Sequence, residues 1–164
     1  MTEAPLYSYR VKVDEIPERG QTVDIAVPQE ALQAIAKSFG LVSVSDLTAS
    51  IALKRKGKEV HATGTMQAHV TQTCVVSLDA FDETVQENVD LRFAPDAPAL
   101  DDVNAPLDAP DPIIGGEIEL GGLVVEFLAL ALDPYPRKPG AEFQFKDETA
   151  GEHPFAALKK WTKE

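Results

Sequence analysis

The chain has few of the residues from which disulfides, thiolate metal sites and nucleic-acid interfaces are built. Cys74 is its single cysteine, which excludes an intramolecular disulfide and any metal site that needs several thiolates from one chain. Lysine and arginine number 15 against 27 acidic residues, so the formal net charge is -12. This charge opposes binding to the polyphosphate of a nucleic acid over a broad surface. Any contact with RNA must therefore be local.

Long apolar runs are also missing. The N-terminus has no apolar core of a secretory signal, and the most apolar segment, residues 118–132, is too short and too interrupted to cross a bilayer. We therefore expect a cytoplasmic protein without membrane contact. Its 164 residues are 44% hydrophobic, which is enough for one domain with a buried core plus appended segments.

The sequence does contain regular alternation of apolar and polar residues, which predicts an α+β fold built on an antiparallel meander of about five strands. A basic turn at residues 55–58 predicts a hairpin, and Gly64 predicts a bend or bulge in the longest strand. A helix over residues 28–39 follows the second strand, because Pro28 can open it and Gly40 can close it. The predicted strands cover residues 7–13, 23–27, 47–53, 60–78 and 85–93.

The C-terminal half is organised differently. Residues 94–116 are rich in proline and aspartate and predict an extended acidic linker. Residues 117–140 predict a long apolar helix that packs on the sheet and ends at a proline-rich turn. We expect this helix and turn to complete the domain begun by residues 1–93. Residues 141–164 predict a flexible tail with a short amphipathic helix.

The apolar helix predicted over residues 117–132 contains one residue that needs an explanation. Its apolar side chains cover most of the circumference, so it requires burial on more than one side. Glu126 is the only charge between Leu123 and Leu132, and a buried carboxylate needs a cationic partner or a raised pKa. We expect Glu126 at the wet edge of the helix or beside a basic residue. A role as acid or base is the alternative.

Three segments in a fixed order resemble a known bacterial family. They are residues 70–78, with a strand that ends at Phe93, then the Asp-Pro linker, and finally residues 118–130 with the turn Pro134-Tyr135-Pro136. Together they resemble the YceD family, the DUF177 domain also called large ribosomal RNA subunit accumulation protein, over roughly residues 20 to 140. The closing residues 154–160 look like the tail of its alphaproteobacterial branch.

The resemblance implies a role in the accumulation of large-subunit ribosomal RNA, genes often adjacent to one for a small ribosomal protein, and no established enzymatic activity. The chain departs from the pattern of the family in two places. Many relatives carry Cys-x-x-Cys-Leu where this chain has residues 74–78, and many end with a cysteine-rich knuckle where it has residues 137–142. A zinc ion held by such relatives would lack its thiolates here. The residues that match the family pattern are Gln72, Cys74, Leu120, Gly121, Glu126 and Pro136.

Two clusters of cations and one apolar tail are the candidate contacts with RNA or another partner. Four cations on the predicted hairpin could neutralise a few phosphates. The structural alternative is a solvated turn whose lysines protect a sheet edge. The candidate residues are Lys54, Arg55, Lys56 and Lys58 on the hairpin, Arg137 and Lys138 in the proline turn, and Phe155, Leu158 and Trp161 on one side of the tail helix.

Cys74 lies in phase with the apolar positions of its predicted strand, so we expect a small buried side chain. A nucleophile is the alternative, but no basic residue flanks Cys74 to lower its pKa. The three histidines lack ligand spacing, and no phosphate loop, nucleophile elbow or His-Glu metal motif occurs. We therefore expect no enzyme, no cofactor and no metal.

These observations favour a non-catalytic binding module in ribosome assembly, whose partner is precursor ribosomal RNA or a basic ribosomal protein steered by the negative charge. A monomer is the expected state. One alternative is a metal-dependent nuclease or hydrolase, although a flexible linker holds carboxylates too loosely for magnesium. A dimeric adaptor that associates through the helix at 117–132 is the other. The carboxylates of the hydrolase alternative are Asp101, Asp102, Asp108 and Asp111.

Overall fold

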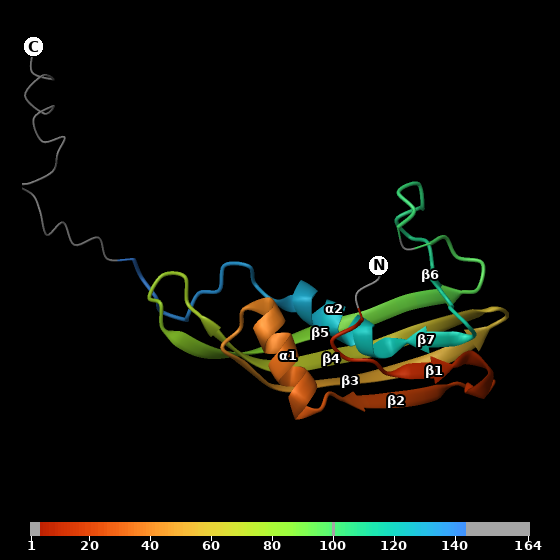
Figure 1. Ribbon diagram of the computed structural model, residues 1–164, viewed down its shortest axis with the longest axis horizontal. Helices are drawn as coiled ribbons and strands as arrows, with labels where there is room; N and C mark the ends of the chain where they lie inside the picture. Colours follow the sequence, from red (N-terminus) through yellow and green to blue (C-terminus); the bar gives the residue numbers. More distant parts are fainter. Residues whose placement is uncertain (1–3, 100, 144–164) are drawn as a thin grey trace, which may run out of the picture.

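The fold has two layers, a main sheet and, against one of its faces, two helices with a small second sheet (Figure 1). The computed structural model describes residues 4–99 and 101–143. The main sheet has the strand order β2-β3-β4-β5-β6, and β1 pairs with β7 in the second sheet. The strands are β1 (Arg10–Lys12), β2 (Gln21–Ala26), β3 (Ser43–Lys56), β4 (Glu59–Thr73), β5 (Ala80–Ala94), β6 (Asp111–Pro112) and β7 (Glu117–Glu119). The helices are α1 (Gln29–Phe39) and α2 (Leu120–Ala131), and a 3-10 turn (Val13–Glu15) follows β1.

Strands β2 to β5 form an antiparallel meander, in which each strand pairs with the next one along the chain. The strand predicted at residues 7–13 is not part of it, because β1 covers only Arg10–Lys12 and pairs with β7 in the second sheet, so the meander has four strands instead of five. The α+β class and the helix after the second strand are confirmed. Strand β6 was not predicted and differs from the others, because it pairs with the end of β5 in parallel, at Phe93 and Ala94.

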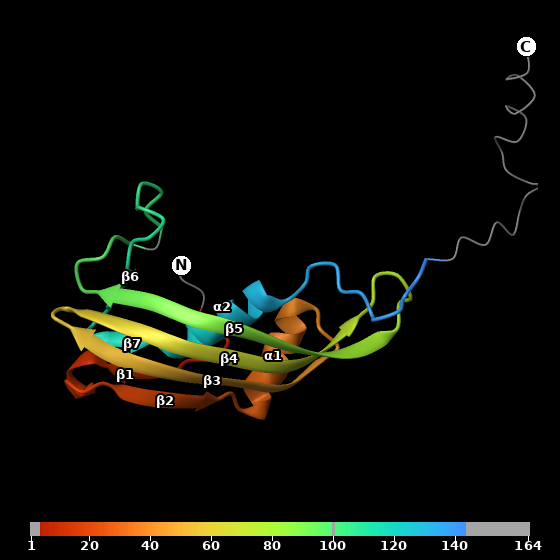
Figure 2. The same ribbon diagram turned by 180° about the vertical axis from the view of Figure 1, so that it is seen from behind.

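The core lies between the inner face of the main sheet and the helices. Side chains of β4 alternate strictly, so that Met66 and Ala68 are inaccessible to solvent whereas Thr65 and Gln67 are exposed. The outer face of the meander is polar, and no helix among the described residues covers it (Figure 2). The helices contribute Leu32, Ile35 and Ala36 from α1 and Leu120, Val124, Val125 and Leu128 from α2 to the buried face.

Helix α1 begins and ends where its sequence predicts. Pro28 occupies the N-cap position with an extended backbone, and Gly40 ends the helix in the left-handed conformation, with a φ of 65°. Glu30 in the first turn and Lys37 in the last turn have the charges that the helix dipole favours.

Helix α2 is shorter than the helix expected over residues 117–132, since it has 12 residues and begins at Leu120. Residues 117–119 are instead β7, because the alternation of Glu117, Ile118 and Glu119 lets the chain pair with β1. The burial of α2 is also one-sided. Ala129 and Leu130 are exposed, so the expectation of burial on more than one side is wrong.

The prediction of the longest strand, residues 60–78, is wrong about where the strand ends and about a bulge at Gly64. Strand β4 ends at Thr73, and the chain turns at residues 74–77 although the apolar parity continues through the turn. Gly64 pairs in register with Ile51 and Val89, without a bulge. A Cβ at Gly64 would lie 1.9 Å from the carbonyl oxygen of Ser50, so the glycine serves the close approach of two strands.

Candidate functional site

The basic hairpin, residues 54–58, connects β3 to β4 at one end of the main sheet. Lys54, Lys56 and Lys58 are exposed and Arg55 is half-buried. Gly57 opens the two-residue loop with a φ of 64°, a conformation that favours glycine. Among the described residues none of these four cations has an ion-pair partner. Their charge is therefore available to a partner.

The strand register extends this charge onto the outer face. Lys54 of β3 pairs with His61 of β4, and His61 in turn pairs with Arg92 of β5, which places the three side chains in one row about 5 Å apart at Cβ. Glu59 lies 3.4 Å from the His61 ring, and Arg92 donates a hydrogen bond to the backbone oxygen of Asp108. The candidate residues named from the sequence did not include Arg92. Only the register across three strands reveals its place.

The second cationic candidate, Arg137 and Lys138, lies at the opposite end of the sheet, where the segment after α2 meets the turn between β4 and β5 (Figure 1). Strand β4 separates the two ends with 15 residues, which correspond to roughly 45 Å at about 3.3 Å per residue. The fold therefore does not bring the two cationic candidates together.

At this second end, hydrogen bonds fasten the β4–β5 turn to the segment after α2. The amide of Val75 donates to the carbonyl oxygen of Pro136 at 2.9 Å. The sulfur of Cys74 accepts from the amide of Ser77 at 3.4 Å and from the amide of Lys138 at 3.3 Å. We call these five residues the Cys74 corner. Two of them, Cys74 and Pro136, match the family pattern. Each accepts a hydrogen bond that holds the β4–β5 turn against the segment after α2.

Cys74 is buried, as its strand parity predicted, but its ionisation differs from expectation. Hydrogen bonds from the hydroxyl and amide of Ser77, with those from the amides of Lys138 and Val76, outweigh burial and lower the pKa of the thiol to about 6. The Ser77 hydroxyl and nearby backbone amides thus do what we expected only of a flanking basic residue. The side chain is 0% exposed, so no reagent can reach the sulfur without movement of the corner.

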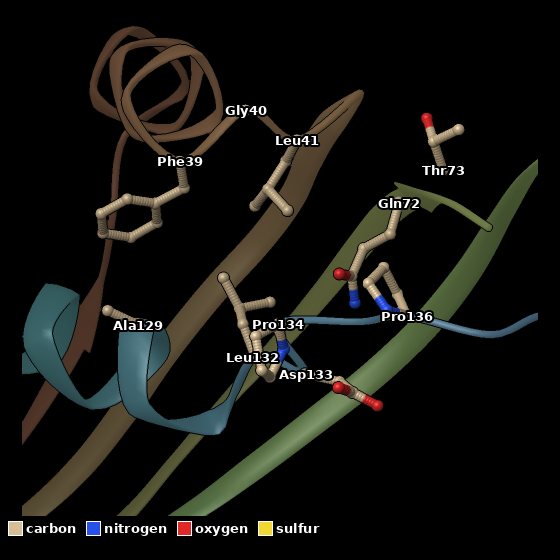
Figure 3. A pocket seen from close by; sticks show the side chains of 10 residues that line it. All are labelled: Phe39, Gly40, Leu41, Gln72, Thr73, Ala129, Leu132, Asp133, Pro134 and Pro136. Atoms are coloured by element: carbon tan, nitrogen blue, oxygen red, sulfur yellow. The ribbon is translucent and has the colours of Figure 1, made fainter. Parts of the chain in front are cut away.

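A hollow of about 390 Å³ lies beside the Cys74 corner, between the end of α1, the end of β4 and the segment after α2 (Figure 3). Phe39, Leu132 and Pro136 give it an apolar lining. Gln72 also lines it and is the one buried polar side chain of the described residues. Its amide donates to Glu83 at 2.8 Å, which satisfies that group within the fold.

The three family-pattern residues of α2 have distinct surroundings. Leu120 is 1% exposed in the core. A Cβ at Gly121 would lie 2.4 Å from the backbone nitrogen of Tyr9, so this glycine allows the N-terminal segment to cross the helix. Glu126 is exposed. The expectation that it lies at the wet edge of the helix is confirmed.

Glu119 is a residue that sequence reasoning missed. Its carboxylate caps α2 by accepting from the amide of Gly121 at 2.9 Å, and it accepts from the Ser8 hydroxyl at 2.6 Å and from the Arg10 guanidinium at 3.1 Å. Burial raises the pKa of this carboxyl, but hydrogen bonds from the Ser8 hydroxyl, the Arg10 guanidinium and the amides of Tyr9 and Gly122 outweigh it and hold the pKa below its ordinary value. Glutamate is not a common N-cap residue, so the sequence offered no signal for this role.

The tail residues and possible metal or membrane sites remain to be placed on the fold. Phe155, Leu158 and Trp161 lie outside the described residues. Within residues 4–99 and 101–143, no three histidine, cysteine or acidic side chains are grouped as metal ligands would be. In the same part of the chain, every helix is too short or too polar to cross a membrane.

Comparisons with known proteins give one match. No curated protein and no solved structure is similar to the chain at a significant level. The family model described as large ribosomal RNA subunit accumulation protein YceD matches residues 62–160, which is more than half of the chain. The match covers most of β4, the Cys74 corner, α2 and most of the tail. Compared with the resemblance noted in the sequence, it begins later, after the basic hairpin, and extends further toward the C-terminus. The chain therefore belongs to the YceD family of large ribosomal RNA subunit accumulation proteins.

Proposed function

We propose that this protein is a non-catalytic binding factor that supports accumulation of large-subunit ribosomal RNA by contacting precursor RNA through the basic hairpin. The family description supports a role in large-subunit RNA accumulation and names no reaction. The observation that carries the choice of site is the set of cations at residues 54–58, none of which has an ion-pair partner within residues 4–99 and 101–143. In a protein with a net charge of -12, RNA is held where cations project beyond the acidic body.

The proposed contact is with phosphates. The outer face of β3, β4 and β5 presents mainly threonine, serine, glutamine and asparagine side chains next to the hairpin, with the carboxylate of Asp90. Among its described residues there is no phenylalanine, tyrosine or tryptophan, and its rings are the imidazoles of His61 and His69. Proteins that hold single-stranded bases on a sheet stack them on aromatic rings. Beside the hairpin the described surface offers one imidazole, His61, and no larger ring, so binding depends mainly on charge and is insensitive to base sequence.

Two other functions have less support. A metal-dependent hydrolase would need grouped carboxylates, whereas Asp101, Asp102 and Asp108 are exposed on turns and flexible carboxylates suit magnesium poorly. A dimer through α2 would compete with the packing of its apolar side on β4 and β5. Light scattering of the purified protein distinguishes the expected monomer from the dimer of that alternative.

The proposal is tested by reversing two exposed charges of the hairpin, Lys54→Glu with Lys56→Glu. We expect association of the tagged protein with large-subunit precursor particles to fall in sucrose gradients. For purified RNA, the slope of log affinity against log salt concentration should decrease by about 2, because two phosphate contacts are lost. Circular dichroism reports whether each variant is folded.

The matched control reverses Lys12 and Lys37, two exposed lysines that lie in the helical layer. This variant has the same net charge as the hairpin variant, and it differs in the position of the changes and in the loss of the exposed Lys12–Glu15 ion pair and of the Lys37 charge at the end of α1. Equal losses in both variants would show that overall charge decides the association. Normal association of the hairpin variant would leave residues 54–58 as a solvated turn and would refute the proposed site.

A further inference from the structure

A second groove, different from the hollow in Figure 3, lies between α2, the β6 segment and the N-terminal segment. It has a volume of about 510 Å³. Phe93 and Val125 form buried parts of its lining, while Leu6 and Ile114 are 40% and 72% exposed. The groove therefore offers an apolar surface that the described chain leaves open to solvent.

Two carboxylates face this apolar lining from different elements. Asp111 of β6 is half-buried and Glu126 of α2 is exposed, and both line the groove. Neither has an ion pair or a side-chain hydrogen bond with another described residue. Burial raises the pKa of Asp111, which means that its negative charge is poorly stabilised where it lies. A cation entering the groove would relieve this cost.

Glu119 also lines the groove, but its carboxylate already has partners within the fold. Arg10 lies 3.1 Å from its carboxylate, and the amide of Gly121 donates to it. The charge in this groove that no other described side chain neutralises therefore belongs to Asp111 and Glu126. This assignment gives a role to the one acidic residue in the apolar part of α2.

We propose that this groove binds an apolar and basic segment of a protein partner. A lysine or arginine of the segment would lie between Asp111 and Glu126, and an apolar side chain would pack on the apolar lining of the same groove. The inference rests on the proposed function in one respect, since it names a protein partner for the same assembly factor. An RNA strand suits this groove poorly, because its phosphates would face both carboxylates.

The occupant comes from outside the chain on two grounds. The net charge of -12 attracts basic proteins over a distance. The described chain ends at Phe143 near the Cys74 corner, at the end of the molecule away from β6 (Figure 1). The groove and the basic hairpin, in contrast, are close, since Phe93 in the groove pairs with Val60 just after the hairpin. RNA and a basic protein segment can thus bind on opposite faces of one end of the sheet.

The test measures binding of a fluorescent amphipathic peptide of leucine and lysine by anisotropy, using the full-length protein. Asp111→Asn with Glu126→Gln should weaken binding about tenfold for each carboxylate. Asp14→Asn with Glu18→Gln removes the same charge from exposed positions outside the groove and should leave binding within about twofold. Ile114→Ser, at a highly exposed position, should weaken binding without loss of the fold.

Each outcome decides the inference. Equal weakening in both double variants would show non-specific attraction to an acidic protein and overturn it. Tighter peptide binding after removal of residues 144–164 would identify the tail as the occupant. Displacement of the bound peptide by an RNA oligonucleotide would identify RNA as the occupant. Either result would overturn the proposal of a protein partner. The hairpin variant should bind the peptide normally. Normal peptide binding with lost ribosomal association therefore separates this inference from the proposed function.

Discussion

Two adjacent glycines at the start of α2 have opposite packing requirements. A Cβ at Gly121 would clash with the backbone of Ser8 and Tyr9, at 2.4 Å from the nearest atom, whereas at Gly122 the nearest atom would lie 3.6 Å away. Gly121→Ala should therefore destabilise the protein by about 3 kcal/mol, because the N-terminal segment must move. Gly122→Ala should stabilise it by up to about 1 kcal/mol, since alanine favours the helix. Urea unfolding measures both.

The pair provides its own control, because both changes add one methyl group to the same helical turn. Similar effects of the two substitutions would contradict the packing assigned to Gly121. A destabilised Gly121→Ala protein should also show faster hydrogen exchange in β1, which this crossing holds against the helix.

The thiol of Cys74 predicts a specific dependence of stability on pH. Its pKa is about 6 in the folded protein, against 9.0 for the unperturbed group. Since the folded pKa is depressed, the contribution is complete above pH 9 and is lost as the pH falls through 6. Wild-type stability should therefore rise between these values relative to Cys74→Ser, which does not ionise there. The free energy of unfolding of both proteins, measured across this range, tests the prediction.

A parallel course of the two stability curves would mean that Cys74 remains a neutral thiol. Ultraviolet absorbance of the thiolate gives an independent reading in the folded wild type. Slow reaction with a thiol reagent at pH 9, despite ionisation, is expected because the sulfur is covered by the segment from Pro136 to Lys138.

At the scale of elements, Glu119 links three of them: β7, whose last residue it is, α2, which it caps, and the segment leading into β1. Glu119→Ala should cost about 2 kcal/mol, which is the upper range for a lost helix cap. The contribution should also disappear on acidification, because the folded pKa lies below its ordinary value. Hydrogen exchange of residues 8–12 should increase. Thermal unfolding and exchange mass spectrometry check these expectations.

Glu117→Ala is the matched control for this change. Glu117 lies on the same strand and approaches Arg10 only to 3.8 Å, an exposed contact of the kind that contributes less than about 1 kcal/mol. A loss as large as that of Glu119→Ala would assign the effect to surface charge in β7 rather than to the cap.

The elements themselves show which features a sequence can predict. Helix α1 was predictable because Pro28 and Gly40 act locally, and the meander because strand parity survives in β2 to β5. The turn after Thr73 was missed because Cys74 and Val76 keep the apolar parity of β4 although the chain has left the strand. In that corner the burial comes from the segment after α2, which is distant in sequence.

The candidate site was predictable to a similar degree. The basic hairpin follows from a local turn signal, and its position agrees with expectation. Arg92 and Asp111 depend on register and on parallel pairing at β6, which no local pattern encodes. Glu126 could be predicted to lie at the surface, but its companion across the groove could not.

At the scale of the whole molecule, the net charge of -12 opposes the compact state. Few ion pairs among the described residues offset it. Moderate salt should therefore raise the melting temperature by about 3 °C through screening, while it weakens RNA binding. Calorimetry over a salt series tests this, and the series repeated near pH 4.6, the isoelectric point, should show no rise. A fall in melting temperature with salt at neutral pH would contradict it.

The 15 residues of β4 keep the two ends of the main sheet far apart. The basic hairpin lies at one end of the strand and the segment with Arg137 and Lys138 at the other, and effects of substitutions this far apart normally add. If a single RNA element bridged both ends, a double-mutant cycle between them would show a coupling free energy. Simple additivity would instead mean that each end has its own partner, so that the sheet works as a rigid spacer between two independent attachments.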